Sequence, residues 1–341
     1  MITYINILRV LAGIFVVLLH VSGDGFDLDL ETYNKGSMNW WVTNAYNSIT
    51  RWTVPIFVMM GGALAIRPKN QRMTNYILKR SKRVLVPLLF WALIYLGYRI
   101  GFNGLSIDRA FYQFFISGKP FYHLWYFYML LGLTILTPVL SLIREKYGEW
   151  FVGLVGLVLL ILFLTVPASH DVFPLVRVES VPAYLVWFMP YLGYYCLGSY
   201  FANMKNRIKP MLIVLLLLIL WTVTIIGVYY ADRIFHSYLA WNTAGISILI
   251  FVLFKQMNFA SGISKISTKL APLTLGVYLM HPLLLELLKG HRYNNRLDKP
   301  HIGNSNDHTL LLVDLSIIHA IILKTQTAVT GGCIAKLSRL V

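Results

Sequence analysis

The chain alternates between long apolar blocks and short polar segments. Most blocks are about 20 residues long, which is the length that an α-helix needs to cross a bilayer. The apolar residues are continuous rather than alternating, which argues against a transmembrane β-barrel. The pattern predicts about ten membrane-spanning helices, over residues 4–23, 46–66, 84–102, 122–143, 149–166, 183–202, 208–230, 238–257, 271–289 and 309–330.

Composition supports an all-α, polytopic integral membrane protein. Only 13% of the residues are charged and 57% are hydrophobic, whereas a soluble domain carries about 25% charged residues. We expect a single membrane-embedded domain over residues 1–341, because no segment between the blocks is long enough for a soluble one. Residues 291–341 are atypical, since Asp314, His319 and Lys324 interrupt the apolar run. This tail is either divergent or the product of an altered terminal coding sequence.

The charges of the loops predict the orientation in the membrane. The segments after the second, sixth and eighth blocks are basic, whereas the first loop is acidic, with Asp24, Asp27, Asp29 and Glu31 against Lys35. Because positive loops remain in the cytoplasm, both termini should be cytoplasmic. The loop before the last block breaks this rule, with Arg292, Arg296 and Lys299. On the outer side, residues 109–121 are expected to form an amphipathic helix on the membrane surface.

The formal charge of +16 does not indicate nucleic-acid binding. The basic residues lie in short loops between apolar blocks, as topological signals do, and no basic domain stands apart from them. Both cysteines, Cys196 and Cys333, lie in or beside apolar blocks, so no disulfide framework is expected. The histidines fall on different spans without ligand spacing, so a metal is not expected either.

Ionisable residues inside membrane spans indicate function, because they are costly to insert. The first block holds Arg9 and His20, eleven residues apart, which is close to three helical turns. Both side chains should therefore point in the same direction, about 16 Å apart along the axis, with Arg9 nearer the cytoplasm. Snorkelling of Arg9 to the headgroups and an interfacial position for His20 are the alternatives.

Further polar residues lie in or near the outer halves of other blocks. They are Arg51 in the second, His123 in the fourth, and His281 and Glu286 in the ninth. An aromatic interfacial belt is the alternative reading for His123, and a helix break before Pro282 is the alternative for His281. At the cytoplasmic side, the positive-inside rule alone explains Arg80 and Arg83 as well as a functional role does.

Several of these segments resemble the membrane acyltransferase-3 family. They are Arg9-x10-His20, the segment from Arg51 to Gly62, Phe121 to Phe127, Leu275 to Pro282, and Arg80-x-x-Arg83 followed by Pro87. The resemblance covers residues 1–290 in the expected order. The family's usual Ser-Gly is replaced by Gly61-Gly62. The resemblance implies ten helices in the inner membrane, acetyl-CoA as the donor, a surface glycan or its lipid-linked precursor as the acceptor, and a need for Arg9 and His20.

On this reading His20 is the general base that takes the proton of the acceptor hydroxyl. Asp24 is a candidate to orient the ring of His20. Arg51 or His123 is a candidate to support the carbonyl oxygen of the acyl group. Arg9, Arg80 and Arg83 are candidates to hold the donor, while His281 and Glu286 are candidate binding residues. Two rival functions stay open: a transporter or flippase for a lipid-linked glycan, and a membrane sensor or structural subunit. The particular glycan, the oligomeric state and the choice between acetyl and succinyl groups stay open as well.

Overall fold

The computed structural model describes residues 2–23, 30, 33–67, 72–164 and 186–297, and all regular elements in these ranges are helical. The all-α prediction is therefore confirmed for this part of the chain. The α-helices are α1 (Thr3–Gly23), α2 (Met38–Thr50), α3 (Thr53–Ala65), α4 (Met73–Asn103), α5 (Ile107–Phe115), α6 (Trp125–Leu164), α7 (Leu192–Asn203), α8 (Pro210–Ala231), α9 (Trp241–Gln256), α10 (Ser261–Leu270) and α11 (Thr274–Leu297).

Within the described ranges, six helical stretches are long and apolar enough to cross a membrane. They contain α1, α4, α6, α8, α9 and the α10–α11 pair. Helix α6 joins the fourth and fifth predicted spans across a kink at Gly148, where φ is 80°. The predicted tenth span, 309–330, lies outside the described residues. The total of ten spans and the cytoplasmic termini therefore stay predictions.

The second predicted span, 46–66, is not one helix. It is divided into α2 and α3, and Arg51 and Trp52 form the turn between them. Pro55 explains the division, because its missing N–H and rigid ring are tolerated only in the first turn of a helix, where the structure places it. Helices α3 and α7, with 13 and 12 residues, are too short to span a bilayer alone.

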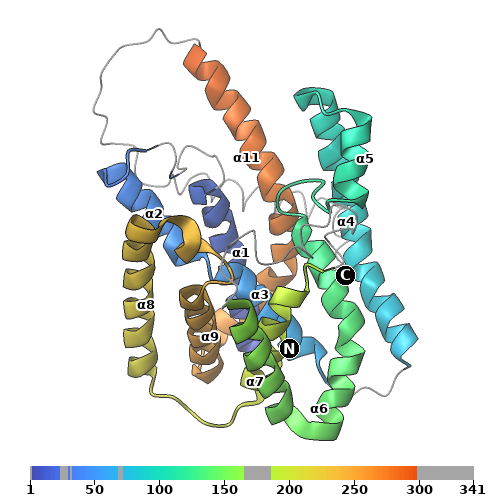
Figure 1. The fold of residues 1–341 in the computed structure, drawn as a ribbon, viewed down its shortest axis with the longest axis vertical. Helices are drawn as coiled ribbons and strands as arrows, with labels where there is room; N and C mark the ends of the chain where they lie inside the picture. The colour runs from blue at the N-terminus through green and yellow to red at the C-terminus, as the bar shows by residue number, and fades with distance from the viewer. Residues whose placement is uncertain (1, 24–29, 31–32, 68–71, 165–185, 298–341) are drawn as a thin grey trace.

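Helix α1 lies at the centre of the helical bundle and contacts α2, α3, α9, α10 and α11 (Figure 1). Helices α8 and α9 lie to one side of it in this view, and α4 and α6 lie to the other. At the Thr3 end of α1, Thr3 and Asn6 form hydrogen bonds with Ser264 and Thr268 of α10. The first predicted span thus packs against several other helices, and its polar side chains are buried or half-buried.

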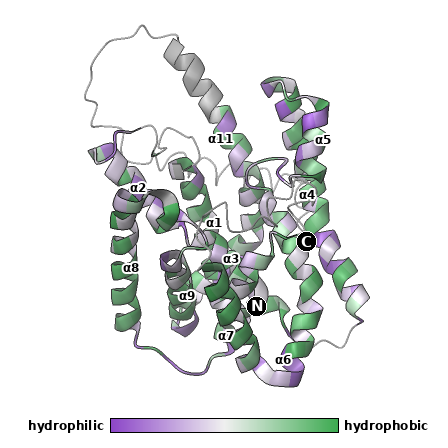
Figure 2. Cartoon of the chain, in the orientation of Figure 1, coloured by the Kyte–Doolittle hydropathy of each residue, from purple (hydrophilic) through white to green (hydrophobic). Residues whose placement is uncertain are grey.

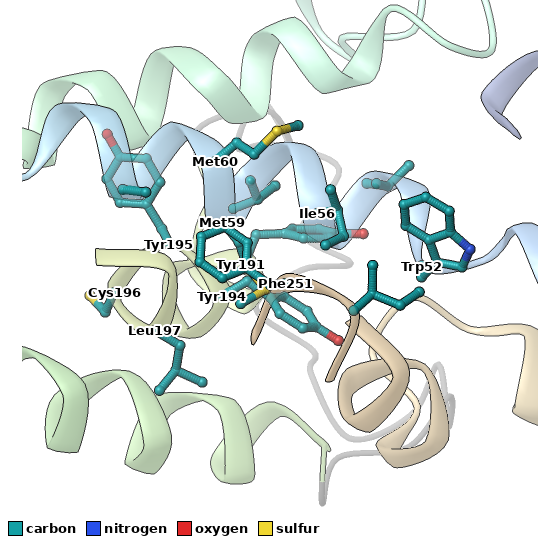
Figure 3. Close-up of a cluster of buried hydrophobic side chains, with 14 of the residues drawn as sticks. Trp52, Ile56, Met59, Met60, Tyr191, Tyr194, Tyr195, Cys196, Leu197 and Phe251 are labelled. Carbon is teal, nitrogen blue, oxygen red and sulfur yellow. The ribbon is translucent and has the colours of Figure 1, made fainter. Parts of the chain in front are cut away.

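The hydrophobic core is built around α3 and α7. Figure 3 shows Ile56 and Met59 of α3 near Tyr194 of α7 and Phe251 of α9. The two short helices approach so closely that a Cβ on Gly62 would lie 1.8 Å from the carbonyl oxygen of Tyr195. Close approach at small residues is the usual means by which helices associate in membranes, where no water drives them together.

The outer helices present large apolar side chains on the surface. Helix α8 exposes many of them, among them Met211, Leu215 and Leu218, and it is hydrophobic along its whole length in Figure 2. A soluble monomer rarely exposes so large a continuous apolar surface. The apolar helices and their exposed side chains therefore indicate a membrane protein, whose bundle interior carries the polar groups.

Two helices differ from the predicted boundaries. The amphipathic helix predicted over 109–121 is present as α5 but ends at Phe115, and Gly118 follows with a φ of 62°. The basic segment between the eighth and ninth predicted spans is helical as α10, with Lys265 and Lys269 on it. At the base of α6, Arg144 pairs with Glu149 across the Gly148 kink and donates to the carbonyl oxygen of Ile66.

Candidate functional site

Three predicted histidines meet at one place in the bundle. The ring of His20 on α1 stacks on that of His281 on α11, with 5.1 Å between centroids. The ring of His123, in the turn before α6, lies 5.7 Å from that of His281. Sequence reasoning placed His20 and His123 at similar depths and His281 closer to mid-depth, but it had no means of showing that the three rings touch. Both His123 and His281 are buried, with exposed fractions of 1% and 0%.

The backbone around His123 is held by a tyrosine from α11. The hydroxyl of Tyr278 donates to the carbonyl oxygen of His123 at 2.5 Å. The His123 ring is enclosed by the rings of Tyr95, Tyr278 and Phe121, with centroids 5.1 to 5.8 Å away. Among the described residues, neither of its ring nitrogens has a hydrogen-bond partner. Because such buried groups are costly, this imidazole is a candidate to bind a polar group of a ligand.

Tyr95 of α4 fixes the course of α11 next to His281. Its hydroxyl donates to the carbonyl oxygen of Leu279 at 2.7 Å and accepts from the N–H of Leu283 at 3.2 Å. An uninterrupted helix would join these two backbone groups directly, since they are four residues apart. A side chain inserted here, beside the ring of Pro282, is a recognised cause of a helix kink. Tyr95 thereby helps to set the position of His281.

The electrostatic neighbours of Arg9 include a second arginine. They are Tyr126 of α6 and Arg80 of α4, and the side chain of Arg9 is largely buried. Within the described residues, neither arginine forms an ion pair. Arg80 is half-buried, whereas Arg83 is exposed, and of the two only Arg80 is an electrostatic neighbour of Arg9. Two converging cations without an acid form a site suited to an anion.

A row of aromatic rings connects the two ends of the site. Tyr126, the neighbour of Arg9, lies 5.7 Å from Tyr278, whose ring is 5.9 Å from that of His281. His281 in turn stacks on His20. The prediction that Arg9 and His20 point in the same direction agrees with these contacts, because His20 touches Tyr122 while Arg9 faces Tyr126, four residues later.

Arg51 is fixed in the turn between α2 and α3. Its Nε donates to Oδ1 of Asn47, and the amide nitrogen of Asn47 donates to the carbonyl oxygen of Ser22, two residues after His20. Its guanidinium also lies over the ring of Tyr238, 5.7 Å from the centroid. The structure thus ties Arg51 to the His20 end of α1.

The remaining predicted site residues are Glu286 and Asp24. Glu286 is half-buried on α11 and interacts electrostatically with Tyr95. Asp24, proposed to orient His20, lies outside the described residues. In the ranges that the structure describes, no three acidic, histidine or cysteine side chains are arranged to hold a metal ion.

Sequence reasoning missed four tyrosines and one asparagine of the site. Tyr122, Tyr126 and Tyr278 stand inside segments that carry the family resemblance, which was the available signal. Asn47 stands in the second apolar block, where its amide was a signal of a buried polar contact. Tyr95 gave no comparable signal, because its partners are about 180 residues away in the chain.

Comparison with known proteins gives one match. A family model described as an acyltransferase domain matches residues 2–323, which is nearly the whole chain. Searches of curated proteins and of solved structures found no match. A match of this extent includes every residue of the candidate site, from Arg9 to Glu286. The chain therefore belongs to the acyltransferase-3 family of membrane acyltransferases.

Proposed function

We propose that the protein transfers an acetyl group from cytoplasmic acetyl-CoA to a hydroxyl group of a surface glycan or its lipid-linked precursor. The observation that carries this proposal is the pairing of two unlike sites within one bundle. A cationic site at Arg9 and Arg80 is joined by aromatic rings to a histidine cluster at His20. The family membership supplies the reaction class.

The cationic end suits the donor. Coenzyme A carries phosphate groups, and guanidinium groups bind phosphate through charge-assisted hydrogen bonds. Basic loops indicate that this end faces the cytoplasm, where acetyl-CoA is made. Arg9 and Arg80 then bind the phosphates, and the thioester lies deeper in the bundle, along the rings of Tyr126 and Tyr278.

The histidine end suits the acceptor and the chemistry. A neutral imidazole of His20 takes the proton of the acceptor hydroxyl as its oxygen attacks the thioester carbonyl. The new C–O bond forms, the C–S bond breaks, and the thiolate of CoA leaves with the proton returned to it. His123, with its two ring nitrogens open within the described structure, is placed to support the carbonyl oxygen or the acceptor. Arg51 holds the end of α1 through Asn47.

A polysaccharide acceptor is supported by one further resemblance. The segment from Phe121 to Pro138 is similar to the enterobacterial common antigen O-acetyltransferase. On this basis we place the protein in the inner membrane, with lipid, acetyl-CoA and a glycan or lipid-linked glycan as its partners. A transporter of the same glycan is the alternative, and it predicts movement without any covalent change.

The test compares ester content in surface glycans from three strains: intact, deleted, and carrying His20→Ala. We expect O-acetyl ester to fall in both altered strains while the glycan still reaches the surface. Membrane levels of the variant, measured by immunoblotting, separate lost chemistry from lost protein. Persistent ester with loss of surface glycan would instead favour the transporter.

A further inference from the structure

A cavity of about 410 Å³ opens beside the histidine cluster. It is lined by Lys119, Tyr122, Trp125, Trp187, Pro190 and Tyr191, so four of its six lining side chains are aromatic. The volume lies in the range of sites that take small molecules. Arg9, Arg80 and His20 do not line it, but Tyr122 of the candidate site does, so the cavity adjoins that site.

The wall of the cavity offers several aromatic surfaces at angles to one another. Trp125 lies 5.5 Å from Tyr191 at 40° and 6.2 Å from Trp187 at 80°. The faces of such rings carry negative charge and attract weakly positive C–H groups. A pyranose ring presents one face of C–H groups and an edge of hydroxyl groups, which matches this wall better than a purely apolar ligand does.

Lys119 adds a positive charge to the cavity. Its Nζ lies over the ring of Trp187, 5.3 Å from the centroid, and within the described residues it forms no ion pair. Among the described residues that line the cavity there is no carboxylate. The ammonium group is held in place by a ring and is available to an anionic group of a ligand.

The cavity adjoins the surroundings of His20 and Arg51, the two residues that we expect on the acceptor side. Tyr122 lines the cavity and also contacts the ring of His20, at 5.0 Å. Trp125 stacks on Tyr238, over which Arg51 lies. We propose that this cavity is the acceptor subsite, binding a sugar ring on its aromatic side chains and the carboxylate of an acidic sugar at Lys119. This inference rests on the proposed function for its acceptor, but sugar binding itself is testable without any transfer.

The experiment measures binding by saturation-transfer NMR. Purified full-length protein in lipid nanodiscs is titrated with methyl glucuronide and with methyl glucoside, which differ only in the carboxylate. We expect ring-proton signals from both, with at least threefold tighter binding of the glucuronide. Trp187→Leu should lose most of the signal, whereas Trp150→Leu, at an exposed site on α6, should retain it.

Lys119→Gln tests the charge separately. This variant should still bind methyl glucoside as the wild type does, but should lose the preference for the glucuronide. Equal signals from Trp187→Leu and wild type would overturn the aromatic subsite, and a glucuronide preference that survives in Lys119→Gln would overturn the role of Lys119. Binding as expected without any ester formation would leave the subsite standing and refute the proposed transfer.

Discussion

Arg80 and Arg83 lie about one helical turn apart on α4, yet their surroundings differ. Arg80 is half-buried beside Arg9, whereas Arg83 is exposed. From the sequence alone both were explained equally well as topological signals. The structure separates them, because within its described part Arg80, and not Arg83, interacts electrostatically with Arg9.

This contrast gives a matched pair of variants. Arg80→Gln should raise the KM for acetyl-CoA by roughly 10- to 100-fold, because one or two charge-assisted hydrogen bonds to the donor are lost. Arg83→Gln should leave the KM near the wild-type value. Initial rates at varied acetyl-CoA in isolated membranes provide the measurement. Equal effects of the two substitutions would mean that Arg80 does not bind the donor.

The sequence was sufficient to single out several site residues, but not to predict which of them touch. Arg9, His20, His123 and His281 stood out because charged and polar side chains are rare in apolar blocks. The contacts among the three histidines depend on how α1, α11 and the turn before α6 pack together, which no local pattern records. Tyr95 went unnoticed for the same reason, since a tyrosine in an apolar helix is ordinary until its hydroxyl is seen to bond.

At the scale of elements, the course of α11 depends on Tyr95. Tyr95→Phe leaves the carbonyl of Leu279 and the N–H of Leu283 without the inserted hydroxyl. We expect a loss of about 1–3 kcal/mol in stability, or a straighter helix that moves His281 away from His20. Either result lowers the transfer rate with little change in the KM for acetyl-CoA.

Thermal unfolding in detergent and steady-state kinetics measure the two effects. The control is Tyr98→Phe, on the same helix, whose hydroxyl has no hydrogen bond recorded within the described structure. If Tyr95→Phe and Tyr98→Phe behaved alike, the inserted hydroxyl would have no role in positioning His281.

The close packing of α3 and α7 predicts that two neighbouring glycines differ sharply in how well they tolerate substitution. A Cβ on Gly62 would lie 1.8 Å from the backbone oxygen of Tyr195, whereas one on Gly61 would lie 3.3 Å from its ring. Gly61→Ser, which restores the Ser-Gly expected from the family resemblance, should therefore be tolerated. Gly62→Ser should cost about 3 kcal/mol or more. Yield of folded protein after detergent extraction distinguishes them, and equal yields would contradict the packing.

Elements also differ in how well the sequence predicted them. Helices such as α1, α8 and α9 followed from length and apolar content alone. The break at Arg51 was missed because the apolar run continues through it, although Pro55 was a visible signal. Helix α5 was predicted to end six residues too late, because aromatic residues continue past the turn at Gly118.

At the scale of the whole molecule, the orientation in the membrane is the open prediction. Charge asymmetry places Asp108 of α5 outside and Lys205, after α7, in the cytoplasm. In a Cys333→Ser background, Asp108→Cys should react with an impermeant maleimide in spheroplasts. Lys205→Cys should react only after permeabilisation, and Cys196 should contribute little background because it is buried. The reverse labelling pattern would show that the orientation in the membrane is opposite to the predicted one.

The central claim is that acetyl passes from the Arg80 side of the bundle to a glycan at the His20 side. The most direct measurement supplies radiolabelled acetyl-CoA to sealed inside-out vesicles that contain the acceptor glycan, and counts alkali-labile label on that glycan. Wild type and Arg83→Gln should form labelled ester, and His20→Ala should form it roughly 10²- to 10⁴-fold more slowly. Undiminished labelling by His20→Ala, or no labelling by wild type in the presence of both substrates, would contradict the account.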